Sequence, residues 1–474
     1  MPPELWKWPA AELARAIRCR RVSPVEATTA VLAHVAAQQP RLNCFITVCA
    51  DQALAQARAA EGALMRGDAL GALHGVPFSV KDIVNTRDVA TTFGALPLRG
   101  NVPAEDAVSV ARLRRAGAIL IGKTTTPEFG SKGFTDAPLF GATPNAWSPR
   151  HTCGGSSGGA AVAVAAGMAP LAIATDGGGS TRIPAACNGV VGIKQTIGVV
   201  PHSQALDLFG NQTYVTPTAR TVLDTALMLD AMAGPHPCDP WSQGRAAVDH
   251  VQAVRAARDL RGKRFRYNVA PHGRRVSAQV EQAFRQALLH IESLGGSVEP
   301  FEAQLDIEPL WRTVNHTVWR ARFAPLVQQH GDALSATFRR QIESAQDYSA
   351  LDYQNAMFAR SRLFHTMQGW LDDADFLVMP TLTRTALPLG TDIFDRMEID
   401  GAEMGDIRAN WYPWTMPFNM TGHPAVSIPC GFDSERLPVG LQIVAPMFCD
   451  AQMLQAAACL EASFNLLQAW PDMS

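Results

Sequence analysis

Apolar runs alternate with amphipathic stretches along most of the chain. Residues 23–39 open with Ser-Pro, a common helix start, and continue with apolar positions at helical spacing. Residues 108–118 repeat this pattern and lead directly into ILIGK at 119–123, which is typical of a buried strand. The same order recurs at 160–175, and another helical stripe follows at 218–234. This alternation predicts an α/β fold in which helices cover a sheet.

The second half of the chain is less regular but ends in the same pattern. A short strand-like stretch at 264–269 precedes helical patterns at 279–294 and over most of 307–370. Three apolar runs are then typical of core strands: residues 376–380, 425–429 and 439–444. No linker is rich enough in Gly, Pro or Ser to divide the chain, so we expect these strands to join the sheet of the first half.

Two serine-bearing glycine clusters flank a small-residue segment within residues 153–184. Glycine has no Cβ, so the backbone N–H groups beside it can approach a ligand closely. Ser156 and Ser180 are therefore candidate functional residues. The uncharged segment between them is rich in Ala and Gly and contains Pro170, which favours a buried helix, a turn and a buried strand over a membrane span. Ser156 is then expected near a helix N-terminus and Ser180 just past a strand end.

Glycine clusters also have simpler interpretations. A run such as GGSSGG is typical of a flexible loop. A phosphate-binding loop needs Gly-Lys-Ser/Thr after the glycines, and neither cluster has it. Composition alone leaves a loop and an active-site turn open.

Lys81 is a third candidate, at the end of the strand-like run GVPFSVKD. Most lysines are solvated surface charges, but this one follows apolar residues. Burial of its ammonium group would lower the pKa toward that of a usable base.

Composition narrows the classes of partner. Lys and Arg number 41 and Asp and Glu 43, a net charge of −2, which gives no reason to expect a nucleic acid or an anionic membrane. The nine cysteines are odd in number and never spaced as CxxC, so neither a disulfide scaffold nor a zinc site is indicated. Residues 1–21 are typical of an amphipathic helix and lack the core of a signal peptide. We expect a cytoplasmic protein.

With these three residues in place, the sequence resembles the amidase signature family of serine hydrolases. GVPFSVKD carries the family lysine, GGSSGGAAVAVAAG the first serine and DGGGSTRIPAA the second, and GATPNAWSPR and VGIKQTIGVVP also match. The resemblance implies one α/β domain over residues 1–474, with a central mixed β-sheet covered by helices on both faces. Within it, 71–234 would form the catalytic core, 235–375 a variable substrate-shaping region, and 376–446 would return to the core sheet.

The resemblance also implies a catalytic role for each of these residues. Ser180 would be the nucleophile, and Ser156, preceded by a cis peptide bond, would relay its proton to a neutral Lys81. Ser157 would support this network by hydrogen bonding. No metal and no cofactor is expected.

The turn before the nucleophile has two further roles in this family. Asp176 and Arg182 resemble the internal ion pair that holds the turn in shape. Backbone N–H groups are expected to stabilise the developing oxyanion: those of Gly177, Gly178 and Gly179, together with the Ser180 amide.

A Ser-His-Asp triad is the alternative for a serine hydrolase. No histidine lies in the three motifs, although His74, His151, His202 and His423 lie near matched segments. We expect all four to be loop or packing residues.

Several positions are candidates for the substrate pocket. Thr125 stands where Asn is frequent in the family, and Cys153 where Pro is frequent; we expect them to shape the acyl pocket, with Cys153 acting by packing and not as a reactive thiol. The segment 410–425 is rich in aromatic residues. Four of them could either line a hydrophobic substrate channel or pack in the core: Trp411, Tyr412, Trp414 and Phe418.

The function implied is an amidohydrolase that forms an acyl-enzyme and acts on a small-molecule amide, with esters and carbamates as further substrates. In the glutamine-hydrolysing subunit of tRNA-dependent amidotransferases, an acidic residue meets the substrate ammonium; here Tyr412 occupies that position. This favours an apolar or aromatic substrate. The alternatives are a subunit of such an amidotransferase and a binding module without activity, the latter disfavoured because all three catalytic residues are present. A homodimer is one open oligomeric state.

Overall fold

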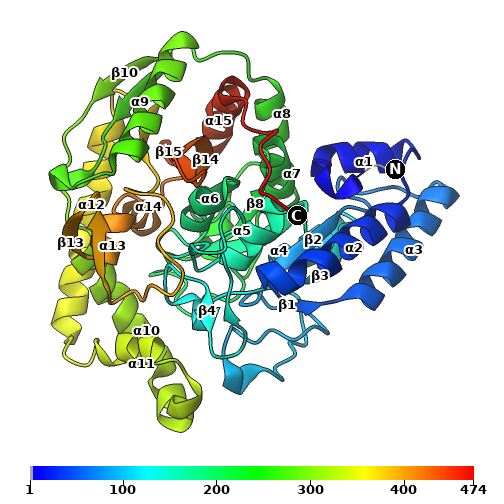
Figure 1. Ribbon diagram of the computed structural model, residues 1–474, viewed down its shortest axis with the longest axis horizontal. Helices are drawn as coiled ribbons and strands as arrows, with labels where there is room; N and C mark the ends of the chain where they lie inside the picture. Colours follow the sequence, from blue (N-terminus) through cyan, green and yellow to red (C-terminus); the bar gives the residue numbers. More distant parts are fainter. Residues whose placement is uncertain (1–3, 474) are drawn as a thin grey trace.

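Eleven strands form a mixed sheet at the centre of the molecule (Figure 1). The computed structural model describes residues 4–473, so residues 1–3 and 474 of the predicted domain lie outside the described part. In spatial order the strands are β1 (Phe45–Val48), β3 (Ile119–Thr124), β2 (Pro77–Lys81), β6 (Leu171–Asp176), β8 (Tyr214–Ala219), β7 (Val191–Lys194), β14 (Ala425–Phe432), β15 (Pro438–Val444), β11 (Phe376–Pro380), β9 (Arg264–Tyr267) and β10 (Ser297–Pro300).

Strand direction changes across this sheet. β2 runs parallel to both neighbours, β3 and β6, so the carboxyl ends of these three strands lie at one edge. From β6 through β8, β7, β14 and β15 to β11, all neighbours are antiparallel, and β9 and β10 continue parallel to β11. The three predicted C-terminal strands therefore join the same sheet as the N-terminal ones, as expected.

Helices cover both faces of the sheet, because successive strand residues enter different apolar clusters. In β6, Leu171 and Ile173 pack with residues of α7 (Val222–Met232) and α15 (Asp450–Phe464). The alternate residues Ala172 and Ala174 pack on the other face with α2 (Pro24–Leu42) and α5 (Gly158–Ala165). This two-sided burial explains the apolar run Leu171–Ala174 at the start of β6, and it confirms the predicted fold class.

The remaining helices and two small hairpins surround this core. The helices are α1 (Ala10–Arg18), α3 (Ala50–Arg66), α4 (Val108–Arg115), α6 (Arg182–Asn188), α8 (His250–Arg255), α9 (Ala278–Ser293), α10 (Glu308–His330), α11 (Ala336–Glu343), α12 (Ala350–Leu371), α13 (Ile407–Trp411) and α14 (Met416–Thr421). The hairpins are β4–β5 (Asp136–Ala137, Gly141–Ala142) and β12–β13 (Arg396–Ile399, Ala402–Asp406). Figure 1 shows α10, α11 and α12 gathered at the opposite end of the molecule from the N-terminal helices α1 to α3.

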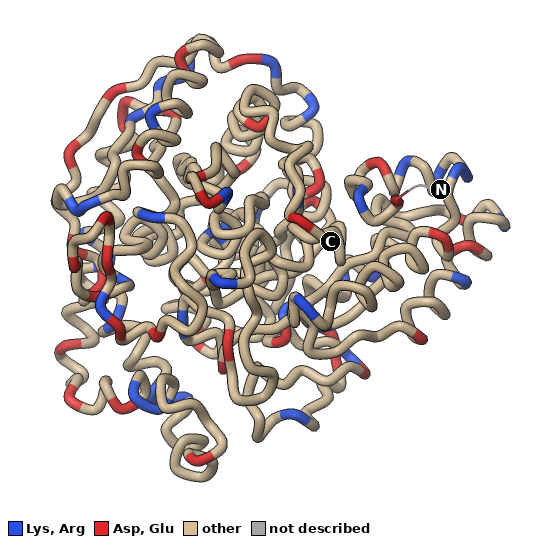
Figure 2. Tube along the Cα trace, in the orientation of Figure 1, with Lys and Arg blue, Asp and Glu red and all other residues tan. Residues whose placement is uncertain are grey.

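The region 235–375 contributes to the core as well as to the periphery, because its strands β9 and β10 extend the central sheet. Acidic and basic residues are interspersed over the outer elements (Figure 2). Among residues 4–473, no helix is both long and apolar enough to cross a bilayer.

Candidate active site

Lys81 ends β2 with its side chain fully buried, as predicted. Its Nζ lies 2.6 Å from Ser156 Oγ, 2.9 Å from Ser157 Oγ and 2.9 Å from Thr175 Oγ1. Burial lowers the pKa of Lys81 well below its usual value, and the charge of Asp176 opposes this only in part. The structure thus places a buried amine, whose charged form burial disfavours, among three hydroxyl groups.

Three chain segments meet at this lysine. β2 and β6 are parallel neighbours, so Lys81 and Asp176 end their strands at the same edge of the sheet. Ser156 and Ser157 directly precede α5. The Gly155–Ser156 peptide bond is cis, as the family resemblance implied. The Ser157 N–H donates to the Ser180 carbonyl oxygen at 3.1 Å, which joins the two glycine turns.

Close packing at the start of α5 explains the glycines after the serines. A Cβ on Gly158 would lie 2.4 Å from Cys153 Sγ, and one on Gly159 would lie 2.3 Å from Thr125 Oγ1. Thr125 and Cys153 are fully buried against this helix and do not line the cavity described below, in contrast to our expectation for the acyl pocket. Burial raises the pKa of the Cys153 thiol to about 12, which agrees with a packing role.

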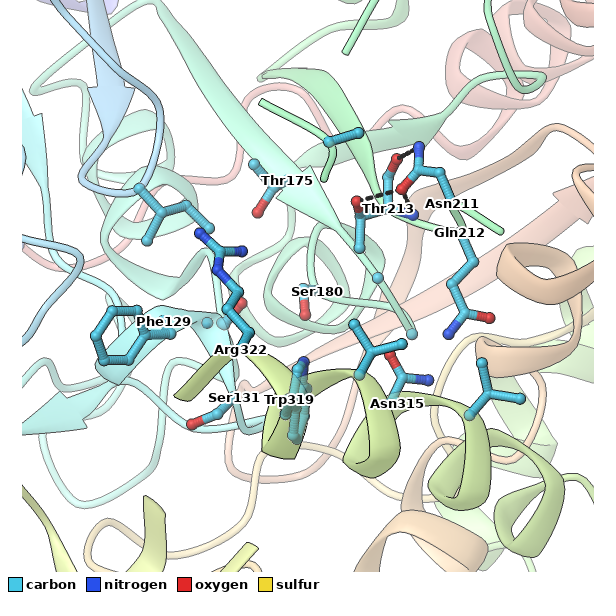
Figure 3. A pocket seen from close by; sticks show the side chains of 18 of the residues that line it. Phe129, Ser131, Thr175, Ser180, Asn211, Gln212, Thr213, Asn315, Trp319 and Arg322 are labelled. Atoms are coloured by element: carbon cyan, nitrogen blue, oxygen red, sulfur yellow. Dashed lines mark hydrogen bonds between the residues drawn. The ribbon is translucent and has the colours of Figure 1, made fainter. Parts of the chain in front are cut away.

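A cavity of about 210 Å³ opens beside the half-buried Ser180 (Figure 3). Ser156 and Thr175 line the same cavity, so the candidate nucleophile and relay face a shared space. The Ser180 hydroxyl makes no hydrogen bond with any residue in the described part of the chain. It is therefore free to meet a ligand.

Two of the three predicted oxyanion glycines also line this cavity. The amide N–H groups of Gly177 and Gly178 have no acceptor within residues 4–473. The Gly179 N–H, in contrast, donates to Asp176 Oδ1 at 2.6 Å. Gly179 is thus not available as an oxyanion donor here, because its amide is part of the support for the turn.

The predicted Asp176–Arg182 ion pair is present and fully buried. Arg182 Nε and Nη2 each lie 3.0 Å from one carboxylate oxygen, and Nη1 donates to Gln442 at 2.8 Å. Burial alone would raise the pKa of Asp176, but the charge and hydrogen bonds of Arg182, with those of Asn419 and the Gly179 amide, lower it below its usual range. The pair fixes the turn that carries Ser180.

Replacing Arg182 with Met should lower the stability of the fold by about 3–5 kcal/mol, because it leaves the Asp176 carboxylate buried without its counter-charge. Urea and thermal unfolding would measure the loss. The double variant D176N/R182M removes both charges and is expected to recover part of it. An R182M protein that unfolds like the wild type would contradict the proposed role of the pair.

The predicted aromatic channel is mostly core. Tyr412 lines the cavity, but Trp411, Trp414 and Phe418 have at most 1% of their surface exposed and do not line it. Trp411 stacks on Phe134 at 5.5 Å between ring centroids, and Trp414 stacks on Phe418 at 6.5 Å. All three belong to one apolar cluster that also contains residues of β11 and α12, so they are part of the core behind the cavity wall.

Much of the cavity wall comes from α10, which was not singled out from the sequence. Trp311, Asn315, Trp319, Arg322 and Phe323 lie on the face of this helix that borders the cavity. In the sequence these residues are spaced by three, four and seven to eight positions, and such positions share one helix face. This spacing is the sequence feature that could have indicated them. The signal is weak, because a core-facing stripe has the same spacing.

The cavity has an aromatic end beside Ser156. Phe129 precedes Gly130, where a Cβ would lie 3.1 Å from Ser156 Oγ. The Phe129 ring lies 4.3 Å from that of Phe323 and 5.1 Å from that of Phe338. Phe129 and Phe323 line the cavity, with the buried Phe338 behind them, and provide an apolar surface for a flat group.

None of the four considered histidines hydrogen-bonds to Ser180. His74, His151 and His423 contact other groups: the Ala60 carbonyl oxygen, Ser148, and both Thr421 and Gln368. His202 lines the cavity, but burial lowers its pKa to about 4. Within residues 4–473 there is also no group of three or more His, Cys, Asp or Glu side chains able to hold a metal ion.

Comparison with known proteins gives consistent matches over the full length. Residues 26–454 match the family described as Amidase. The chain is 36% identical to an acylamidase from Rhodococcus erythropolis, with 98% of this chain and 96% of that protein aligned. It is 35% identical to a glutamyl-tRNA(Gln) amidotransferase subunit from Acidothermus cellulolyticus, covering 96% of this chain and 94% of the relative. The solved structure of a bacterial aryl acylamidase of the amidase signature family superimposes with a TM-score of 0.90 at 27% identity, covering 98% and 99% of the two chains.

Proposed function

We propose that this chain, which belongs to the amidase family and hydrolyses carboxylic amides, does so through an acyl-enzyme on Ser180, with Ser156 and Lys81 transferring the proton. The observation that carries the proposal is the buried lysine within 2.6 Å of a serine hydroxyl that shares a cavity with Ser180. A serine hydroxyl becomes a nucleophile when a neighbouring base removes its proton.

Hydrogen-bond counting supports Ser156 as the relay. A neutral lysine has two N–H donors and one lone pair. Ser157 already donates its hydroxyl proton to the Thr175 carbonyl oxygen at 3.0 Å and accepts from the Thr175 N–H at 3.2 Å, so toward Lys81 it acts as an acceptor. With Ser157 and Thr175 accepting the two N–H groups, the lone pair is left for the Ser156 proton.

The reaction then proceeds in two balanced steps. In the first step, Ser180 Oγ bonds to the carbonyl carbon while its proton passes to Ser156 and the Ser156 proton moves to Lys81. A proton then returns from Lys81 through Ser156 to the nitrogen of the amide as the C–N bond breaks. Water then attacks the ester carbonyl carbon while its proton passes through Ser156 to Lys81. The proton returns to Ser180 Oγ as the ester C–O bond breaks, and the carboxylic acid is released. Gly177 and Gly178 N–H groups, and that of Ser180, are proposed to stabilise the oxyanion of both steps.

We propose an aromatic amide, such as an anilide, as the preferred substrate class. The aromatic end of the cavity supports this, as does the charge of its wall. Asp207 is the one carboxylate lining the cavity in the described residues, whereas Arg322 lines it without an acidic partner among them, and Lys132 and Arg408 line it paired with Asp136 and Glu308. A site with this balance disfavours the ammonium group of glutamine, and Tyr412 offers no counter-charge.

A substrate panel tests the proposal. The purified chain alone should hydrolyse anilides with kcat/KM at least about tenfold above glutamine and primary aliphatic amides, the discrimination that loss of well-packed apolar contacts produces. Matched esters would show how far the same site accepts other carbonyl groups. Glutamine hydrolysis that exceeds anilide hydrolysis, or activity only with a partner protein, would favour the amidotransferase alternative instead.

We propose a cytoplasmic protein that works without a different partner subunit, with a homodimer as the expected assembly. All nine cysteines are unpaired, which suits a reducing compartment. Light scattering on the active fraction would give the oligomeric state.

A further inference from the structure

Gln212 is a buried polar residue of the cavity whose side-chain oxygen has no partner. It lies just before β8, has 5% of its surface exposed and lines the cavity. Its Oε1 accepts no hydrogen bond from any described residue. That oxygen is also shielded from the cavity. The amide nitrogen Nε2 likewise bonds to no described residue, and Figure 3 shows it as the end of the side chain nearer Ser180. A buried polar group without a partner costs about 1–3 kcal/mol, so a ligand that accepts a hydrogen bond from Nε2 would remove part of this cost.

A second glutamine of the same cavity behaves differently. Gln204 accepts the Asn85 N–H at 2.9 Å through Oε1 and donates through Nε2 to the Ile83 carbonyl oxygen at 3.2 Å. Both ends of its amide are used by the protein. The contrast marks Gln212 as the glutamine whose side-chain nitrogen reaches the cavity without bonding to any described residue.

The position of Gln212 relative to Ser180 identifies the part of the substrate it meets. Figure 3 shows Phe129 on one side of Ser180, and Gln212 with Asn315 on the other. Ser156, which returns the proton to the departing nitrogen, lies toward Phe129 through Gly130. The leaving group therefore occupies the Phe129 side, and the acyl group extends toward Gln212.

Asn315 adds a second polar group at this end. Its Nδ2 donates to the Trp311 carbonyl oxygen at 2.9 Å, and the Trp311 indole donates to the Gly177 carbonyl oxygen at 3.0 Å. These bonds fix the wall between Gln212 and the proposed oxyanion donors.

We infer that Gln212 determines acyl specificity by donating a hydrogen bond from its Nε2–H to an oxygen acceptor, such as a hydroxyl group, on the acyl part of the substrate. The inference rests on the proposed function and goes beyond it, because it assigns a polar feature to a substrate otherwise defined by apolar surface. A site built around such a bond rejects the analogue that lacks the acceptor, because the Gln212 N–H group is then left unpaired.

Three pairs of anilides test this, each pairing a terminal hydroxyl with a methyl group of similar size: glycolyl with propanoyl, 3-hydroxypropanoyl with butanoyl, and 4-hydroxybutanoyl with pentanoyl. Wild-type protein should prefer the hydroxyl member of one pair by at least tenfold in kcat/KM. In Q212M this preference should fall below twofold, while the methyl anilides are hydrolysed at nearly the wild-type rate.

Gln204→Met is the matched control. It leaves the Asn85 N–H and the Ile83 carbonyl oxygen without partners, so it should lower the melting temperature but keep the hydroxyl preference. The preference is a ratio within one protein and does not depend on the folded fraction.

Calorimetric binding of the same anilides to Ser180→Ala provides a readout that needs no turnover. The preferred hydroxyl anilide should bind at least tenfold more tightly than its methyl partner, and S180A/Q212M should lose this difference. Equal rates and affinities in all three wild-type pairs, or a preference that survives Q212M, would overturn the inference. Hydrolysis of no anilide at all would instead refute the proposed function, and the binding experiment would still decide the role of Gln212.

Discussion

Replacement of Ser180 with Ala is expected to lower kcat for amide hydrolysis on the order of 10⁴-fold or more, because no acyl-enzyme can form without the hydroxyl oxygen. Residual turnover would come from the oxyanion donors and substrate binding alone. Initial rates with an anilide at saturating concentration measure the loss. The effect should lie in kcat, with little change in substrate affinity.

The fold should tolerate this change. The Ser180 hydroxyl makes no hydrogen bond to a described residue, so its removal leaves no partner unsatisfied. We expect the melting temperature of S180A to match that of the wild type. Ser131 lines the same cavity, and Ser131→Ala is the matched control, with kcat within a few-fold of the wild-type value.

A fluorophosphonate probe gives an independent test of the nucleophile. Intact wild-type protein and S131A should acquire one adduct on the peptide that contains Ser180, and S180A should acquire none. Mass spectrometry of the digested protein locates the adduct. Labelling of a different serine, or normal turnover by S180A, would remove Ser180 from the proposed role.

The elements of the fold that the sequence predicted are those whose burial and ends are encoded in a few adjacent residues. Strands buried on both faces, such as β3, β6 and β11, begin with uninterrupted apolar runs, and helices such as α2 begin with a readable cap at Ser23. The site residues at the ends of these elements followed from the same patterns. Lys81 and Ser180 each lie at or just after the end of a strand, where side chains of neighbouring strands come together.

The wall of the cavity depends instead on contacts between distant segments. Gln212, Asn315 and Phe129 come from three separate parts of the chain, and the glutamine differs from Gln204 only in what surrounds its amide. No local sequence pattern distinguishes a side-chain amide that is hydrogen-bonded within the protein from one that is not. The free amide of Gly178 and the bound amide of Gly179 likewise depend on the path of one turn around Asp176.

The choice between channel wall and core packing, which the sequence left open for the aromatic residues of 410–425, depends on the same kind of contact. Trp411 and Tyr412 are adjacent aromatic residues in the same sequence context. Trp411 nevertheless lies in the core, whereas Tyr412 lines the cavity. Short helices such as α13 present adjacent residues on different faces, and their rotation is set by packing against other elements.

Replacement of Lys81 with Ala is expected to lower kcat for anilides by roughly 10²–10⁴-fold, the usual contribution of a positioned acid and base. A matched ester should lose less, because an alkoxide leaves with less help from a proton donor than an amine does. The variant should fold, as circular dichroism and thermal unfolding would show. Near-normal anilide turnover by a folded K81A protein would end the proton-transfer scheme.

The pH profile separates Lys81 as a base from Lys81 as a structural residue. Burial lowers its pKa well below 10.5, and the neutral form is the active one. Activity should therefore be complete above the lowered pKa and should fall as the pH drops through it, so the acid limb of kcat/KM lies well below the ordinary lysine range. Lys132, which lines the same cavity but pairs with Asp136 at 2.6 Å, is the control. K132M should keep the acid limb of kcat/KM, and the residual activity of K81A should lack it. A wild-type acid limb near pH 10.5 would show that Lys81 is charged at rest.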